Sequence, residues 1–191
     1  MIGRNLSKVD AAGQYPRPKP GGYVIRITNV QNNVKNERIE IEFDIAEGEF
    51  AGYYKGLQER AKFWGGKFYK SYKENAQPFL KQFIELILEC NPGTDGLVVG
   101  DWEDIDETRL VGKAIGMVVG EKEYMGNDGK VKTKLDTYNA EFTTVDAIRA
   151  GEFDVPAFKP LQEQDQPMPG SGNVVDTTAG FGPVSDNDMP F

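Results

Sequence analysis

The segment from residue 53 to residue 83 is rich in basic and aromatic side chains, although the 191-residue chain carries a net charge of −8. It holds seven basic residues against two acidic ones, with nine aromatic residues between them. This combination is typical of proteins that bind single-stranded nucleic acid, because cations follow the phosphates while rings stack on the bases. The candidate binding residues of this segment are Lys55, Arg60, Lys62, Trp64, Lys67, Phe68, Tyr69, Lys70, Tyr72 and Lys73.

The same segment has a second interpretation, in which the rings belong to the core and the lysines are solvated surface residues. Core packing is the better interpretation for Phe79 and Phe83, which lie in a strongly apolar stretch. For the rings from Trp64 to Tyr72 the two interpretations are evenly balanced. Gly65-Gly66 and the flanking lysines favour a surface loop, where large exposed rings indicate a binding role.

A second candidate surface is a hairpin that the sequence predicts at residues 122–134. Its turn is marked by Asp128-Gly129, a frequent hairpin dipeptide. Neighbouring acids balance its cations, so this signal is weaker than the first. Its candidate binding residues are Lys122, Tyr124, Lys130, Lys132 and Lys134.

Two groups of carboxylates raise the alternative of a two-metal nuclease. The first consists of Glu37, Glu40, Glu42 and Asp44, and its alternation with apolar residues indicates the solvated face of a strand. In the second, residues 101–107, the acids lack the spacing of a calcium-binding loop. We therefore expect no catalysis and no cofactor. The strand face would also repel phosphates, so binding is expected nearer to residues 53–73.

The amino-acid composition excludes several other kinds of functional site. The sequence has no histidine, which excludes imidazole catalysis and histidine metal ligands, and its single cysteine excludes an internal disulfide. No apolar run has the length of a secretory signal or a membrane span, so a soluble protein of the cytoplasm is expected.

The apolar pattern predicts a mainly β domain with one long helix. Strands are expected at 23–30, 38–45, 49–57, 109–120 and 131–142, a helix at 78–90 between the third and fourth strands, and a short helix after Thr144. This order is that of the OB-fold, a five-stranded Greek-key barrel with one helix between strands three and four.

Composition divides the chain into three parts. Residues 1–22, with their prolines and glycines, indicate an extended arm, and residues 23–158 the OB-fold domain. Residues 159–191 are rich in Pro, Gly, Ser, Thr, Asp and Asn, have five acids and no base after Lys159, and are expected to be a disordered acidic tail.

The end of the tail resembles the acidic, Pro-Phe-terminated tip of phage and bacterial single-stranded-DNA-binding proteins. The body is similar to the phage members through LVGK (110–113), EYMGNDGK (123–130) and AIRAGEF-x-VP (147–156). Asn187 interrupts the acids, and methionine stands where the familiar tip has isoleucine. The candidate partner-binding residues are Asp186, Asp188, Met189, Pro190 and Phe191.

The resemblance implies a protein that coats single-stranded DNA during replication, recombination or repair in a bacterial host cell, and that recruits partner proteins through its tip. A terminal phenylalanine suits an apolar pocket with a basic rim, because it presents a ring and a carboxylate together. The alternatives are an OB-like interaction adaptor without significant DNA binding and, less favoured, the carboxylate-metal nuclease. Assembly into a homo-oligomer stays open.

Overall fold

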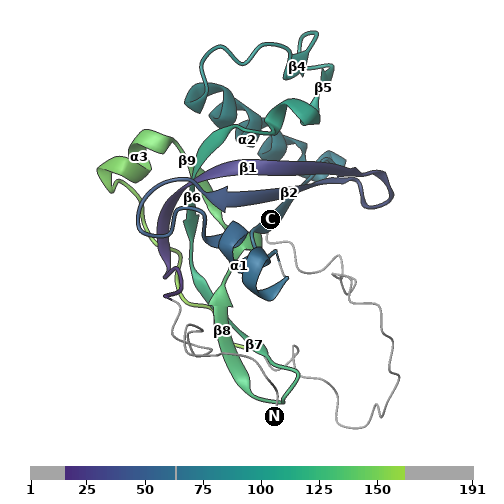
Figure 1. The fold of residues 1–191 in the computed structure, drawn as a ribbon. Coiled ribbons are helices and arrows are strands. Elements are labelled where there is room, and N and C mark those ends of the chain that lie inside the picture. Colours follow the sequence, from purple (N-terminus) through teal and green to yellow (C-terminus); the bar gives the residue numbers. More distant parts are fainter. Residues whose placement is uncertain (1–15, 63, 162–191) are drawn as a thin grey trace, which may run out of the picture. The chain divides into compact units, whose positions relative to one another are not determined.

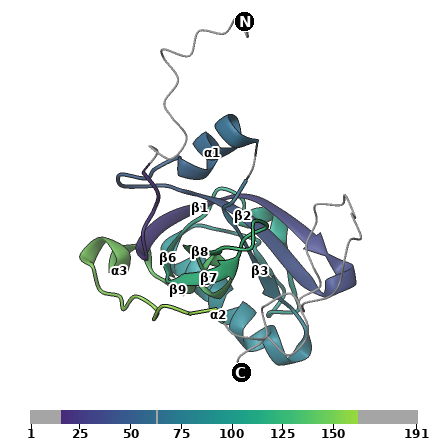
Figure 2. The ribbon, with the colours of Figure 1, turned by 90° about the horizontal axis from the view of Figure 1, so that it is seen from below.

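A curled, antiparallel five-stranded sheet forms the centre of the computed structural model, which describes residues 16–62 and 64–161 (Figures 1 and 2). Neighbouring strands pair in the order β3-β2-β1-β6-β9. The mainly β prediction is therefore confirmed. The strands are β1 (Gly21–Asn33), β2 (Arg38–Ile45), β3 (Lys67–Ser71), β6 (Ala114–Val119) and β9 (Glu141–Thr143).

Strand β2 shows why this sequence forms a sheet with one buried face. Its isoleucines and Phe43 alternate with polar residues, and all of these apolar side chains are buried. In the register of the sheet, Ile27 of β1 lies opposite Phe43, and Phe68 of β3 lies opposite Ile41. The alternation therefore places one apolar face against the core and leaves the other face for polar residues.

The helix predicted at 78–90 is confirmed as α2 (Gln77–Cys90), which covers the buried face of the sheet. Leu80, Phe83, Ile84 and Ile87 are its buried residues. The prediction of a core position is wrong for Phe79, whose exposed fraction is 57%. Phe79 lies at the start of the helix, outside the stripe that faces the sheet.

The two edge strands of the sheet, β3 and β9, approach each other without forming a ladder. The ring centroids of Phe68 on β3 and Phe142 on β9 are 4.9 Å apart. The 3₁₀ helix η4 (Thr137–Asn139) precedes β9, and its Thr137 Oγ1 donates to the Lys67 carbonyl at 3.0 Å. Side chains thus connect the two edges of the curled sheet.

The predicted third strand at 49–57 is wrong, because helix α1 (Tyr53–Ala61) occupies this part of the chain. Asp44 of β2 holds the N-terminus of this helix. Its Oδ1 accepts from the Tyr54 N–H at 2.9 Å, and its Oδ2 accepts from the Lys55 N–H at 3.2 Å. A carboxylate at a helix N-terminus satisfies free amides and favours the helix dipole. Since this cap comes from another element, the local pattern does not reveal it.

The last two predicted strands are shorter than expected. Residues 107–110 form a 3₁₀ helix, η3 (Glu107–Leu110), before β6 begins. The predicted strand 131–142 is divided into β8 (Val131–Leu135) and β9 by η4. The hairpin prediction is confirmed, since β8 pairs with β7 (Glu121–Met125).

The smaller elements complete the domain. Helix α3 (Val145–Ala150) follows Thr144, whose Oγ1 accepts from the Ala147 N–H at 3.1 Å, as the capping pattern predicts. Strands β4 (Val98–Val99) and β5 (Asp104–Ile105) pair, and η1 (Val34–Asn36) and η2 (Glu74–Ala76) are single turns. Among the described residues, no helix has the length and apolarity needed to cross a membrane.

Candidate nucleic-acid interface

The outer face of strands β1, β2 and β3 carries three rows of polar side chains. Each row takes one residue from each strand, because the register places them opposite one another. The rows are Asn29, Glu42 and Lys67; Gln31, Glu40 and Tyr69; and Asn33, Arg38 and Ser71. We call this surface the sheet face.

The carboxylates of β2 are engaged by neighbouring groups. The Lys67 ammonium lies 2.7 Å from Glu42 Oε1, and the Asn29 amide donates to Glu42 Oε2 at 3.4 Å. Asp44 is used as the cap of α1. The repulsion of phosphate that the sequence predicts for this strand is therefore reduced by partners within the sheet face.

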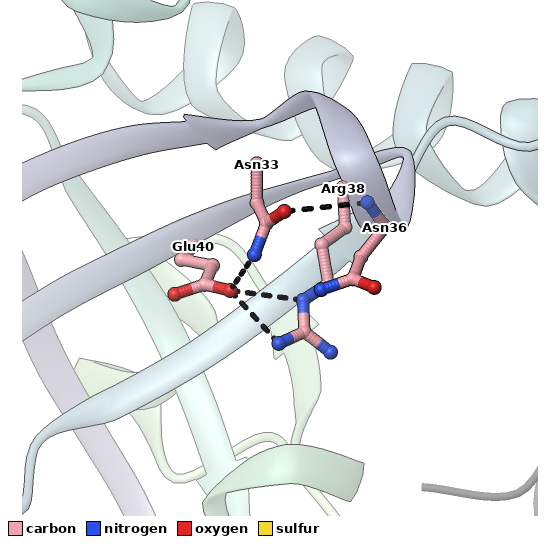
Figure 3. A network of polar contacts seen from close by, with 4 residues as sticks. All are labelled: Asn33, Asn36, Arg38 and Glu40. Carbon is pink, nitrogen blue, oxygen red and sulfur yellow. Dashed lines mark hydrogen bonds and ion pairs between the residues drawn. The ribbon is translucent and has the colours of Figure 1, made fainter. Parts of the chain in front are cut away.

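Glu40 is the centre of a small hydrogen-bond network (Figure 3). The Asn33 amide donates to its Oε1 at 2.8 Å, and Arg38 donates to the same oxygen from Nε at 3.0 Å and from Nη2 at 2.8 Å. Burial raises the pKa of Glu40, but hydrogen bonds from Asn33 and Arg38 lower it more, so that the net pKa is lowered. Glu40 is therefore a fixed carboxylate at neutral pH.

Next to this network, Arg38 and two tyrosines form a cluster, in which the planes of the two rings are tilted by 47°. The Arg38 guanidinium carbon is 4.7 Å from the centroid of Tyr69, and Tyr69 is 5.6 Å from the ring of Tyr138. Tyr138, in η4, has an exposed fraction of 40%. Sequence reasoning missed both Arg38 and Tyr138. The alternation of β2 places Arg38 beside Tyr69, but Tyr138 is brought here only by the turn after β8.

The β7–β8 hairpin presents most of its cations on one side. Lys122 lies opposite Lys134, and Tyr124 lies opposite Lys132, so these four side chains share a face. The Lys134 ammonium lies 4.9 Å from the centre of the Tyr124 ring, and Lys132 pairs with Asp128 at 3.0 Å. Lys130 follows the turn and is exposed. The structure thus brings together the hairpin residues that the sequence predicts.

Asp136 attaches the hairpin to the body. Its side chain has an exposed fraction of 3% and lies 2.9 Å from the Lys122 ammonium and 3.2 Å from that of Lys159. The Asn139 amide donates to it at 2.8 Å. Burial raises its pKa, but the bonds from Asn139 and Lys122 outweigh burial and leave the pKa lowered. One carboxylate thus joins β7, η4 and the segment around Lys159.

The segment around Lys159 runs alongside β7. The Lys159 N–H donates to the Glu121 carbonyl at 3.0 Å, and the Glu123 N–H donates to the Lys159 carbonyl at 2.9 Å. Leu161 N–H then donates to the Glu123 carboxylate at 3.0 Å. The packed part of the chain therefore reaches Leu161 rather than 158. Of the expected tail, only residues 159–161 are described; residues 162–191, with the partner-binding tip, lie outside the described residues.

The sheet face and the hairpin meet at η4. Thr137 donates a hydrogen bond to the Lys67 carbonyl, while the ring of the next residue, Tyr138, packs at a tilt against Tyr69. Burial raises the pKa of Tyr138, Tyr69 raises it further, and the charges of Lys67, Arg38 and Lys122 act against this rise. Cations from β2, β3 and β7 are therefore close enough to act on one exposed ring.

Two predicted binding residues face the core instead. Phe68 has an exposed fraction of 2% and packs against Phe43, Phe83 and Phe142, so the prediction of a stacking ring is wrong. Lys70 follows on the same side of β3, with its ammonium 4.3 Å from the Phe142 ring centre. Burial lowers its pKa to about 8. The alternation of β3 gives the reason, because only Lys67, Tyr69 and Ser71 point to the sheet face.

The remaining predicted residues lie around the margin of the domain. Trp64 is half-buried against the core and donates from Nε1 to the Gly66 carbonyl at 3.0 Å, and the Tyr72 hydroxyl lies 3.1 Å from Asn32 Oδ1. The predicted surface loop is in part helix and strand. Lys55 and Arg60 lie on α1, Lys62 ends this helix, and Lys73 follows β3. Helix α1 contacts β2 near Asp44, at the opposite end of this strand from Arg38.

Comparison of the sequence with protein-family models and with curated proteins gave no match. Within residues 16–62 and 64–161, no group of three or more His, Cys, Asp or Glu side chains is arranged to hold a metal ion.

Proposed function

We propose that this chain binds single-stranded DNA across the sheet face and the adjoining side of the β7–β8 hairpin. The observation that carries the proposal is the cluster of Arg38, Tyr69 and Tyr138, with the charges of Lys67 and Lys122 close enough to act on Tyr138. Rings of this kind provide stacking surfaces for bases, and the cations next to them can follow the backbone. The proposal includes no catalytic step.

We also propose that the domain is an OB-fold. The supporting observations are the pairing of β1 with both β2 and β6, the position of α2 between β3 and β6, and the approach of β3 to β9. In OB-folds the face of strands two and three, with the loop between strands four and five, binds oligonucleotides. The sheet face and the β7–β8 hairpin correspond to these two regions.

For the tail we keep the role that the resemblance implies. The tip, Asp186 to Phe191, recruits replication, recombination or repair proteins, while the body holds DNA. Deletion of Phe191 alone leaves every acid in place and removes the terminal ring. We expect this deletion to abolish the capture of partner proteins in pull-downs and to leave DNA affinity nearly unchanged. Equal capture by both forms would leave the tip without a docking role.

An interaction adaptor is the second candidate, and one observation favours it. Lys67 is paired with Glu42, and Lys122 with Asp136, so both cations already have carboxylate partners. A cation with an internal partner gains less from a phosphate, because the existing pair must be given up. If the chain is an adaptor, its binding of single-stranded DNA or RNA should be weak and should not change with salt.

Fluorescence anisotropy with a labelled oligo-dT tests the proposal against this alternative. Arg38→Ala should weaken binding and make its salt dependence less steep, because it removes a cation next to the Tyr69–Tyr138 pair. Arg149→Ala is a matched control, since Arg149 also makes two hydrogen bonds to one carboxylate, that of Glu47, on another surface. Equal, weak and salt-independent binding by all three proteins would support the adaptor.

A further inference from the structure

Glu40 occupies the middle of the sheet face. Its neighbours across the strands are Gln31 on β1 and Tyr69 on β3. The side chain keeps an exposed fraction of 28%, whereas that of Arg38 is reduced to 16%. A base stacked at the Tyr69–Tyr138 pair would therefore bring its edge close to the Glu40 carboxylate.

The network of Glu40 leaves one oxygen for a ligand. All three donated hydrogen bonds, one from Asn33 and two from Arg38, reach Oε1, and Oε2 receives none of them. Figure 3 shows Oε2 on the side of the carboxylate turned away from both donors. Glu42 differs, because Lys67 engages its Oε1 and Asn29 its Oε2. Glu40 is thus held in a fixed orientation with an acceptor still open.

The chemistry of this acceptor limits which part of a nucleic acid can meet it. A carboxylate repels phosphate and, when ionised, accepts hydrogen bonds without donating any. Cytosine presents the amino group N4–H₂, whereas thymine presents the carbonyl O4 at the same place. Placing the carboxylate against O4 would bring two acceptors together and remove water from both, which is unfavourable.

We propose that Glu40 makes the sheet face select bases with an exocyclic amino group, so that single strands of cytosine bind more tightly than those of thymine. This inference rests on the proposed function. The amides of Asn29, Gln31 and Asn33, one from each row, add hydrogen-bonding groups along β1 beside Glu40. The polar groups in the middle of the sheet face therefore contact base edges, and the cations at its margins bind the phosphates of the nucleic acid.

The test compares the affinities of one protein for oligo-dC and oligo-dT of equal length, by anisotropy at neutral pH. We expect the wild type to prefer oligo-dC by roughly five- to tenfold. Glu40→Gln should bring this ratio close to one. Its affinity for oligo-dT should rise, because a negative charge is lost. The ratio isolates base selection from a general change in charge.

Glu42→Gln is the matched control, since it removes the same charge from the same strand at a carboxylate with both oxygens engaged. It should raise affinity for both oligonucleotides and leave the ratio unchanged. An oligonucleotide of N4,N4-dimethylcytosine tests the inference without any variant, because it lacks the amino hydrogens. We expect it to bind wild-type protein no better than oligo-dT.

The outcomes separate the inference from the proposed function. Binding of oligo-dC and oligo-dT with equal affinity would overturn the role of Glu40 and leave single-strand binding in place. An unchanged ratio in Glu40→Gln, or full affinity for the dimethylated oligonucleotide, would overturn it as well. Failure of the wild type to bind any of these strands would instead refute the proposed function.

Discussion

The guanidinium carbon of Arg38 lies 4.7 Å from the ring centre of Tyr69, on the neighbouring strand of the sheet. The Glu40 carboxylate fixes this guanidinium through two hydrogen bonds. A cation held against a ring stays close to the place where a stacked base carries its phosphate. Under the proposed function, the pair would supply both a ring for a base and a cation for a phosphate.

Tyr69 and Phe68 are adjacent residues that should respond in opposite ways to truncation. Tyr69→Ala should lower single-strand affinity by roughly 1–3 kcal/mol, because a stacking ring is lost, with little effect on folding. Phe68→Ala should lower the free energy of unfolding by about 3–5 kcal/mol, because it opens a cavity in the core. Anisotropy and urea unfolding measure the two effects. A large loss of stability in Tyr69→Ala would assign its ring to the core.

Glu42→Gln should tighten single-strand binding at low salt. The substitution releases the Lys67 ammonium from its 2.7 Å pair and removes a negative charge from the sheet face. If the released ammonium takes up one more phosphate, the log–log salt slope should become steeper by roughly 0.7. Titrations over a range of salt concentrations measure this slope. An unchanged affinity and slope would place the phosphates away from Lys67.

Asp136→Asn should destabilise the attachment of the β7–β8 hairpin. Loss of the buried carboxylate leaves Lys122 and Lys159 without their partner and should cost about 1–3 kcal/mol of unfolding free energy. The folded pKa of Asp136 is lowered, so its contribution is complete above the ordinary value of 3.8 and is lost as pH falls through the folded pKa. Urea unfolding of both proteins should therefore differ at neutral pH and converge below 3.8. A difference independent of pH would contradict this role.

Lys70 should make stability depend on pH in the alkaline range. Burial lowers its pKa from 10.5 to about 8, so the folded chain releases this proton before the unfolded chain does. Its contribution to the free energy of unfolding should rise as pH increases from about 8 to 10.5. Lys70→Met should lack this rise and be more stable at neutral pH. The DNA affinity of Lys70→Met should equal that of the wild type. A clear loss of affinity would mean that Lys70 contacts the DNA.

Strict alternation is the part of the sequence that predicted the structure best. The apolar residues of β2 and the hairpin turn at Asp128-Gly129 have local causes, namely the two-residue period of a strand and the backbone freedom of glycine. The N-cap of α3 at Thr144 is local as well. Each of these elements is determined by residues within its own segment, and the sequence alone therefore predicts it.

The errors arose where distant residues decide the structure. Helix α1 depends on Asp44, which precedes it by several residues in another element, and the break between β8 and β9 occurs at the buried Asp136. In β3, Lys70 occupies an inward position, so hydrophobic alternation did not identify the strand. The cluster of Arg38, Tyr69 and Tyr138 was missed for the same reason, because three separate elements supply it.

Photocrosslinking tests the central claim most directly. A single-stranded oligonucleotide containing 5-iodouracil is irradiated with the full-length protein, and the attached peptides are identified by mass spectrometry. We predict attachment at Tyr69, Tyr138 or Tyr124, the rings of the sheet face and the hairpin. The products at Tyr69 and Tyr138 should be lost in the double variant Tyr69→Ala/Tyr138→Ala. Attachment confined to Trp64 or to α1, unaffected by these substitutions, would contradict binding on the sheet face.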